Sequence, residues 1–238
     1  MRANRNILMI EEVARALGDL LEQCVFVGGA TTALYIDDSG APDPTPSDDV
    51  DLLVEVSSQQ EYSALEKTLR KRGFKDPVGI EDAPVCRKYL GHIAVDFMVS
   101  RESVLGFTNQ WYEPALMHLK SVPLPSGLKI KIFSLPYFVA SKLAAFKDRG
   151  AAQDLRMSQD LEDICSVLDG NSDCLDQIAR AEDSVRTWIQ SEVRVLLSDA
   201  PLLEEAASGF IGYSREGDRR VQALMEKFKS LAGTGHRS

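Results

Sequence analysis

Two aspartates separated by one residue precede an apolar run that is typical of a strand. Asp49 and Asp51 flank a valine, and leucine and valine residues follow. Because side chains alternate between the two faces of a strand, both carboxylates share one face. Adjacent like charges are costly unless a cation lies between them. Oxygen ligands of this kind suit Mg²⁺ or Mn²⁺, so we expect a divalent-metal site here, with a solvated strand end as the alternative.

A third aspartate, Asp96, lies within the apolar sequence HIAVDFMV. On a strand it shares a face with His92, Ala94 and Met98, opposite the larger apolar side chains. An aspartate in so apolar a strand must be paired, hydrogen-bonded or bound to a metal, and a bond to backbone is the plain alternative. If it joins Asp49 and Asp51, three acids repel one another. We then expect the loss of the Asp96 charge to leave the stability of the metal-free fold unchanged or higher.

A glycine pair, Gly28 and Gly29, follows the apolar run Val25–Val27. Glycine lets the backbone approach a ligand closely, and N–H groups at the start of a following helix favour an anion. We therefore expect Gly28, Gly29 and Thr31 to cradle a phosphate. An ordinary turn is the alternative.

Hydrophobic periodicity predicts the elements that must position these residues. The predicted elements of the first half are a helix over 7–21, a strand over 25–27, a short helix over 30–36, a loop over 37–48, a strand over 49–56, a helix from Ser57 or Ser58 to Arg72, and strands over 85–90, 92–99 and 128–133. Gly91 indicates a tight connection between two of the strands. Beyond residue 134 the period stays helical, with helices over 136–147, from Ser158 onward, and over 176–197, 201–208 and 215–231. The pattern predicts an α/β (α+β) fold with a boundary near residue 134.

Composition narrows the class of protein. The 238 residues are 44% hydrophobic and 26% charged, as in ordinary globular proteins. A net charge of −9 argues against a general nucleic-acid coat, because phosphate binding depends on Lys and Arg. We find no signal-peptide pattern, no apolar run of membrane-spanning length and no C-x-x-C motif among the four cysteines. We therefore expect a cytoplasmic protein with reduced, buried cysteines and no membrane partner.

The order of strand, glycine pair, helix, loop and D-x-D strand resembles the nucleotidyltransferase superfamily. The sequences VGGATTALYI and DVDLLV are most similar to its AbiEii/MenT branch, the toxins of two-gene toxin–antitoxin systems. In the helical half, SKLAAFKDRG and SQDLEDI resemble the same branch, with a lysine inside a helix, an Arg-Gly turn and an aspartate that starts the next helix. By that match Lys142 and Asp160 are a functional pair. Their structural alternatives are a lysine stem over apolar surface and an acid that suits a helix dipole.

The resemblance implies a nucleotidyltransferase-type mixed sheet with flanking helices over 1–133. A C-terminal helical bundle over 134–238 would complete the active site. It implies Mg²⁺-dependent transfer of a nucleotide from an NTP to an acceptor hydroxyl. Asp49, Asp51 and Asp96 would hold the metal, and Lys142 would add positive charge at the triphosphate.

MenT-like relatives imply that the acceptor is the 3′ end of tRNA and that a cognate antitoxin protein is a partner. A basic cluster could face RNA or be a solvated helix face; it comprises Lys67, Arg70, Lys71, Arg72 and Lys75. The alternatives are an aminoglycoside-type or protein nucleotidyltransferase, or a non-catalytic nucleotide-binding module.

Overall fold

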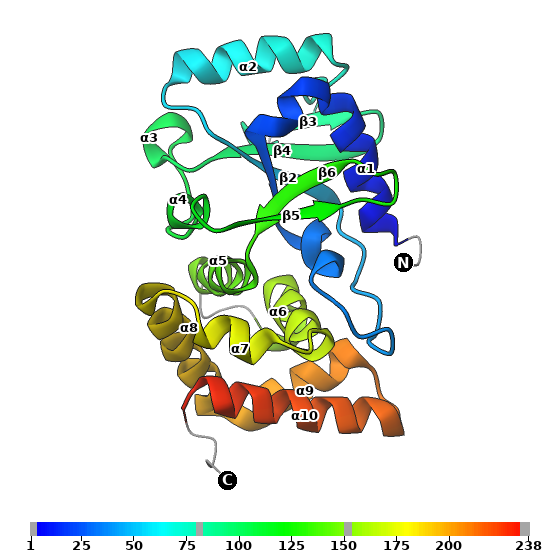
Figure 1. Cartoon of the computed structure of the whole chain (residues 1–238), viewed down its shortest axis with the longest axis vertical. Helices are drawn as coiled ribbons and strands as arrows, with labels where there is room; N and C mark the ends of the chain where they lie inside the picture. The colour runs from blue at the N-terminus through cyan, green and yellow to red at the C-terminus, as the bar shows by residue number, and fades with distance from the viewer. Residues whose placement is uncertain (1–3, 80–82, 150–153, 234–238) are drawn as a thin grey trace. The chain divides into compact units, whose positions relative to one another are not determined.

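The computed structural model describes residues 4–79, 83–149 and 154–233 and has the expected α+β fold (Figure 1). The chain divides into two compact units. The first comprises Met1–Ala33 and Thr45–Ser134, and the second comprises Leu34–Pro44 and Leu135–Ser238. The second unit therefore includes a short segment that lies, in sequence, between the glycine pair and the two aspartates of the first.

A mixed sheet forms the centre of the first unit. Among the described residues it has six strands in the order β3 (Arg87–Leu90), β4 (Ile93–Val99), β2 (Asp49–Val54), β1 (Cys24–Val27), β6 (Lys129–Phe133) and β5 (Leu119–Pro123). β2 pairs in parallel with β4 and antiparallel with β1, and β1 pairs in parallel with β6. The sequence pattern did not predict β5, whose last residue is Pro123. Proline is tolerated here because β5 is an edge strand.

The apolar face of this sheet carries part of the core. Leu52 on β2 and Phe97 on β4 are register partners and are fully buried. Phe74 packs edge-on against Phe97, with ring centroids 5.3 Å apart. Tyr62 of α2 (Gln59–Lys71) donates its hydroxyl to the carbonyl of Phe97 at 2.9 Å. Side chains one residue earlier on each strand therefore belong to the opposite face.

Two helices of the first unit begin at side-chain caps. The helical elements of this unit are α1 (Arg5–Leu17), η1 (Gly18–Gln23), η2 (Gly29–Leu34, whose last residue belongs to the second unit), α2, α3 (Glu102–Leu105) and α4 (Tyr112–Ala115). The predicted helix over 7–21 is too long, because Gly18 adopts a φ of 54° and ends α1. The predicted serine cap of α2 is Ser58, whose hydroxyl accepts a hydrogen bond from the Glu61 N–H at 3.2 Å.

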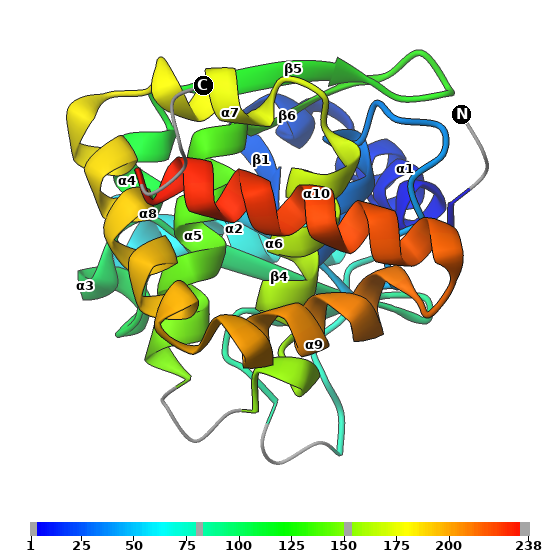
Figure 2. The same cartoon turned by 90° about the horizontal axis from the view of Figure 1, so that it is seen from below.

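The second unit is helical, as the 3.6-residue period predicted. Its described elements are α5 (Leu135–Asp148), η3 (Leu155–Met157), α6 (Gln159–Gly170), α7 (Cys174–Ala179), α8 (Asp183–Leu196), η4 (Leu197–Asp199), α9 (Ala200–Ile211) and α10 (Arg215–Leu231). α9 and α10 lie side by side (Figure 2). Ser158 caps α6 as expected. The single helix predicted over 176–197 is wrong: the backbone is extended at Glu182, and Arg186 donates to the carbonyls of Ala179 and Ala181 at the end of α7.

The segment Leu34–Pro44 is fixed to the end of α6. Asn171 donates its side-chain amide to the Tyr35 carbonyl at 2.6 Å, and the Asp37 and Asp38 N–H groups both donate to the Gly170 carbonyl at 3.0 Å. The predicted proline-rich loop is thus held by specific hydrogen bonds. As a consequence, the chain passes between the two units at three points, after residues 33, 44 and 134.

Two predictions concerned membrane-spanning segments and the state of the cysteines. None of the helices among the described residues has both the length and the apolar character needed to cross a membrane. The four cysteines are buried and free, which confirms their expected state. Burial raises the pKa of Cys24 and of Cys86 to about 12, so these thiols stay protonated at neutral pH.

Candidate metal centre

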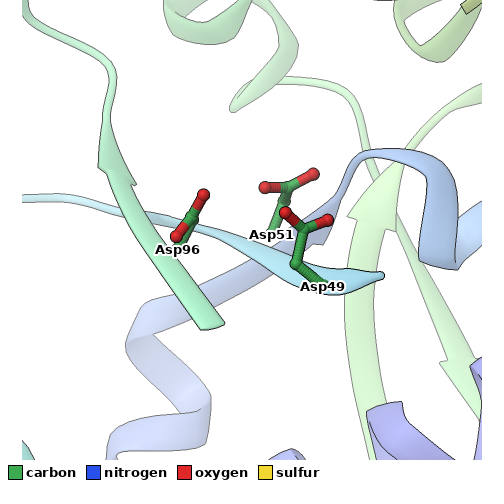
Figure 3. Close-up of side chains that lie close together, drawn as sticks. All are labelled: Asp49, Asp51 and Asp96. Atoms are coloured by element: carbon green, nitrogen blue, oxygen red, sulfur yellow. The ribbon is translucent and has the colours of Figure 1, made fainter. Parts of the chain in front are cut away.

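Three of the predicted site residues lie together on the sheet of the first unit. Asp51 on β2 is the register partner of Asp96 on β4, and Asp49 lies two residues before Asp51. Each aspartate offers a carboxylate oxygen, and these oxygens lie within 4.8 Å of one another. The three side chains project from the same side of the two strands (Figure 3). The parallel pairing of β2 with β4 therefore gathers the carboxylates as the alternation of side chains predicted.

The sequence interpretation missed Arg87, whose guanidinium lies among these carboxylates. Its Nε donates to Asp96 Oδ1 and its Nη2 to Asp96 Oδ2, both at 2.8 Å. The same Nη2 donates to Asp49 Oδ2 at 2.7 Å. The signal that could have revealed it is Gly91: with a tight connection there, counting back from the Leu90–Ile93 pair places Arg87 opposite Asp96.

Repulsion between the carboxylates and attraction to Arg87 act in opposite directions on the pKa of Asp49. Burial and the charge of Asp96 raise the pKa of Asp49, while Arg87 partly opposes the rise. Hydrogen bonds to Asp96 raise the pKa of Arg87 further, so the guanidinium stays charged.

This geometry replaces the expectation that loss of the Asp96 charge would leave stability unchanged or higher. That argument counted repulsion between acids and no cation. With Arg87 in place, the loss removes two charge-assisted hydrogen bonds and should lower stability.

The glycine turn adjoins the carboxylates. Gly28 has a φ of 71°, and a Cβ added there would overlap the carboxylate of Asp51, so no larger residue fits without a shift. Gly29 begins η2. Thr31 is fully buried and its hydroxyl donates to the Gly28 carbonyl at 2.8 Å. A phosphate contact by that hydroxyl would have to replace this hydrogen bond, whereas the turn itself lies directly beside Asp51.

The predicted pair Lys142 and Asp160 meets within the second unit. Lys142 Nζ on α5 lies 3.1 Å from Asp160 Oδ1 and 2.7 Å from Asp163 Oδ2, both on α6. Burial alone would lower the pKa of Lys142, but Asp163 and Asp160 raise it above its ordinary value. Arg149 Nη1 is 2.8 Å from Asp160 Oδ2 but outside hydrogen-bonding geometry. The ammonium expected at a triphosphate is thus held between two carboxylates.

The basic cluster on and after α2 is partly neutralised within the first unit. Arg70 pairs with Asp76 at 2.7 Å and approaches Glu66, and Arg72 pairs with Asp19. Two of its five cations therefore have acidic partners, which favours the solvated-face interpretation over an RNA-binding face.

The donor set at the sheet determines which ligands suit it. Carboxylate oxygens are the ligands that Mg²⁺ and Mn²⁺ prefer, and three of them within a few ångströms can share one ion.

A scan against models of known protein families gave no match for this chain, and a search of curated proteins gave none either.

We expect Gly28→Ala to lower the free energy of unfolding more than Gly91→Ala does. Both glycines have positive φ, 71° and 59°, so both variants carry the left-handed backbone strain of about 1–2 kcal/mol. A Cβ at Gly91 meets nothing within 4 Å, whereas one at Gly28 overlaps Asp51. Urea unfolding of the two variants measures the difference. Equal losses would contradict the close approach of the turn to Asp51.

We expect Asp49→Asn to raise the melting temperature of the metal-free protein at neutral pH. Burial and the charge of Asp96 raise the folded-state pKa of Asp49 even though Arg87 donates to it, so ionisation of Asp49 costs stability at neutral pH. The gain should shrink as the pH falls through the folded-state pKa and should be lost below the unfolded value of about 3.9, where both states hold the proton. Asp48→Asn, which neutralises the exposed neighbouring acid, is the control and should give no comparable gain. A lower melting temperature for Asp49→Asn at pH 7 would contradict the electrostatic argument.

Proposed function

We propose that the protein is a metal-dependent nucleotidyltransferase that moves a nucleoside monophosphate from an NTP to an acceptor hydroxyl. The observation that carries the proposal is the convergence of Asp49, Asp51 and Asp96 on one small volume beside the Gly28 turn. The resemblance of the same stretch of sequence to the nucleotidyltransferase superfamily, and to its AbiEii/MenT branch, supports it.

The aspartates and the glycines of the site would have different roles in binding the metal ion and the nucleotide. Asp49, Asp51 and Asp96 would hold Mg²⁺ or Mn²⁺ through their carboxylate oxygens. The bound ion would orient the α-phosphate and stabilise negative charge on the attacking and leaving oxygens. Gly28 lets the Asp51 carboxylate lie directly against the turn, and Gly29, which carries no side chain, would let the phosphates approach the backbone. Lys142 and Asp160 enter the proposal through the resemblance.

The acceptor that the resemblance implies is the 3′ end of tRNA, in a cytoplasmic toxin with a cognate antitoxin protein. A chain with a net charge of −9 would have to meet RNA through a local surface rather than through its overall field. The same carboxylates could serve transfer to an aminoglycoside-type small molecule or to a protein hydroxyl. A chain that binds nucleotide without turnover would be a nucleotide-binding module. The identity of the labelled product separates these cases.

We expect the full chain to transfer label from an α-³²P NTP in the presence of Mg²⁺, and the Asp49→Asn/Asp51→Asn variant to lose that transfer by at least about 100-fold. The reason is that the variant lacks two of the three metal-ligating charges. The assay uses each NTP in turn, with total tRNA, total protein or an aminoglycoside as acceptor. Asp48→Asn, which removes a neighbouring exposed charge, should keep its activity. Full activity in the double variant would sink the proposal, and nucleotide binding without turnover would favour the binding module.

The toxin assignment has its own test in growing bacteria. We expect induced expression of the wild-type chain to slow growth, because consumption of tRNA 3′ ends stops translation. The Asp49→Asn/Asp51→Asn variant, expressed to the same level, should leave growth unchanged. Unimpeded growth in cells that contain active wild-type enzyme would exclude the toxin role and leave the transferase proposal standing.

A further inference from the structure

We propose that Arg87 is an internal counter-ion that leaves the aspartates when the divalent cation binds and then binds the phosphates of the nucleotide. The inference rests on the proposed function, because it takes the three carboxylates to be the metal ligands. It adds a positioning residue that the resemblance does not assign, and it fixes the order in which charges are exchanged at the site.

Arg87 occupies the carboxylates that a metal ion would need. Arg87 engages both oxygens of Asp96 and one oxygen of Asp49, at 2.7–2.8 Å. A cation shared by the aspartates needs lone pairs on these same residues, and it would lie within a few ångströms of the guanidinium. Since like charges repel strongly at such a distance in a partly buried site, Arg87 and the cation compete for the carboxylates.

The formal charges of the cluster also favour the release of Arg87. Three carboxylates and one guanidinium carry a formal charge of −2, which one divalent cation neutralises. A triphosphate then brings several more negative charges, and the described contacts show one cation already at this cluster that can meet them. Arg87 released from the aspartates would supply that positive charge where the phosphates arrive.

The position and shape of the Arg87 side chain suit such an exchange. Arg87 lies on β3, an edge strand of the sheet, and 23% of its side chain is exposed. Part of the side chain therefore already faces solvent, where it has room to turn away from Asp49. Its guanidinium presents a planar fork that fits a carboxylate or a phosphate equally well, which a lysine ammonium does not.

The experiment measures two affinities that the exchange shifts in opposite directions. Isothermal titration of Mn²⁺ into the full chain should show binding that Arg87→Gln strengthens about tenfold or more, because the competing charge is gone. With Mn²⁺ saturating, the α,β-methylene analogues of the four nucleoside triphosphates should bind Arg87→Gln about tenfold more weakly than wild type. Lys75→Gln removes an exposed positive charge from the same unit and should change neither affinity.

The two readouts separate exchange from a purely structural role. A structural clamp would weaken both affinities on removal, and a bystander would change neither. Either result overturns the proposal, as does tighter Mn²⁺ binding with unchanged nucleotide binding. If Arg87→Gln does not fold, Arg87→Lys serves, because it keeps the charge and loses the fork. It should bind Mn²⁺ near wild-type strength and nucleotide more weakly, and wild-type nucleotide affinity in this variant would overturn the phosphate contact.

Failure of this inference can be told apart from failure of the proposed function. Mn²⁺ binding that disappears in Asp49→Asn/Asp51→Asn but is no tighter in Arg87→Gln keeps the metal centre and rejects the exchange. Absence of Mn²⁺ binding in both wild type and Arg87→Gln rejects the metal centre, and the exchange with it.

Discussion

The parallel register of β2 against β4 is the constraint on which the candidate metal centre depends. It places Asp51 opposite Asp96, and on the other face it places Leu52 opposite Phe97 in the core. A slip of one residue would turn the carboxylates into that core and expose the apolar set, so burial of one face specifies the chemistry of the other. The site therefore needs no stabilising contact of its own to be assembled in the right place.

Carboxylates gathered in one place repel one another. In each unit a basic side chain that bridges two acids offsets this repulsion. In the first unit, Arg87 bridges Asp49 and Asp96. In the second, Lys142 bridges Asp160 and Asp163. Partly buried acids gathered around one cation are costly to assemble and strongly destabilising to break, so such clusters are poor devices for stability alone. Acids whose charge is balanced by a basic side chain are suited to exchange that partner for a ligand.

Local patterns in the sequence were enough for much of the fold and for the carboxylates. Alternation placed Asp49, Asp51 and Asp96, serine caps placed the starts of α2 and α6, and proline and glycine placed the loop before β2. Features that depend on contacts between distant parts of the chain were not predicted. The sequence of β3 does not distinguish Arg87, and its role follows only from its pairing with Asp96 on β4. The membership of Leu34–Pro44 in the second unit rests on hydrogen bonds to residues more than a hundred positions away.

A crystal structure with Mn²⁺ and a non-hydrolysable nucleoside triphosphate tests the central claim most directly, through the anomalous scattering of manganese. The account predicts an anomalous peak in coordination contact with carboxylate oxygens of Asp49, Asp51 and Asp96, about 2.0–2.3 Å from each. It also predicts that the guanidinium of Arg87 has left Asp49 for a phosphate oxygen. Manganese bound elsewhere, with Arg87 still forked to Asp96, would contradict it.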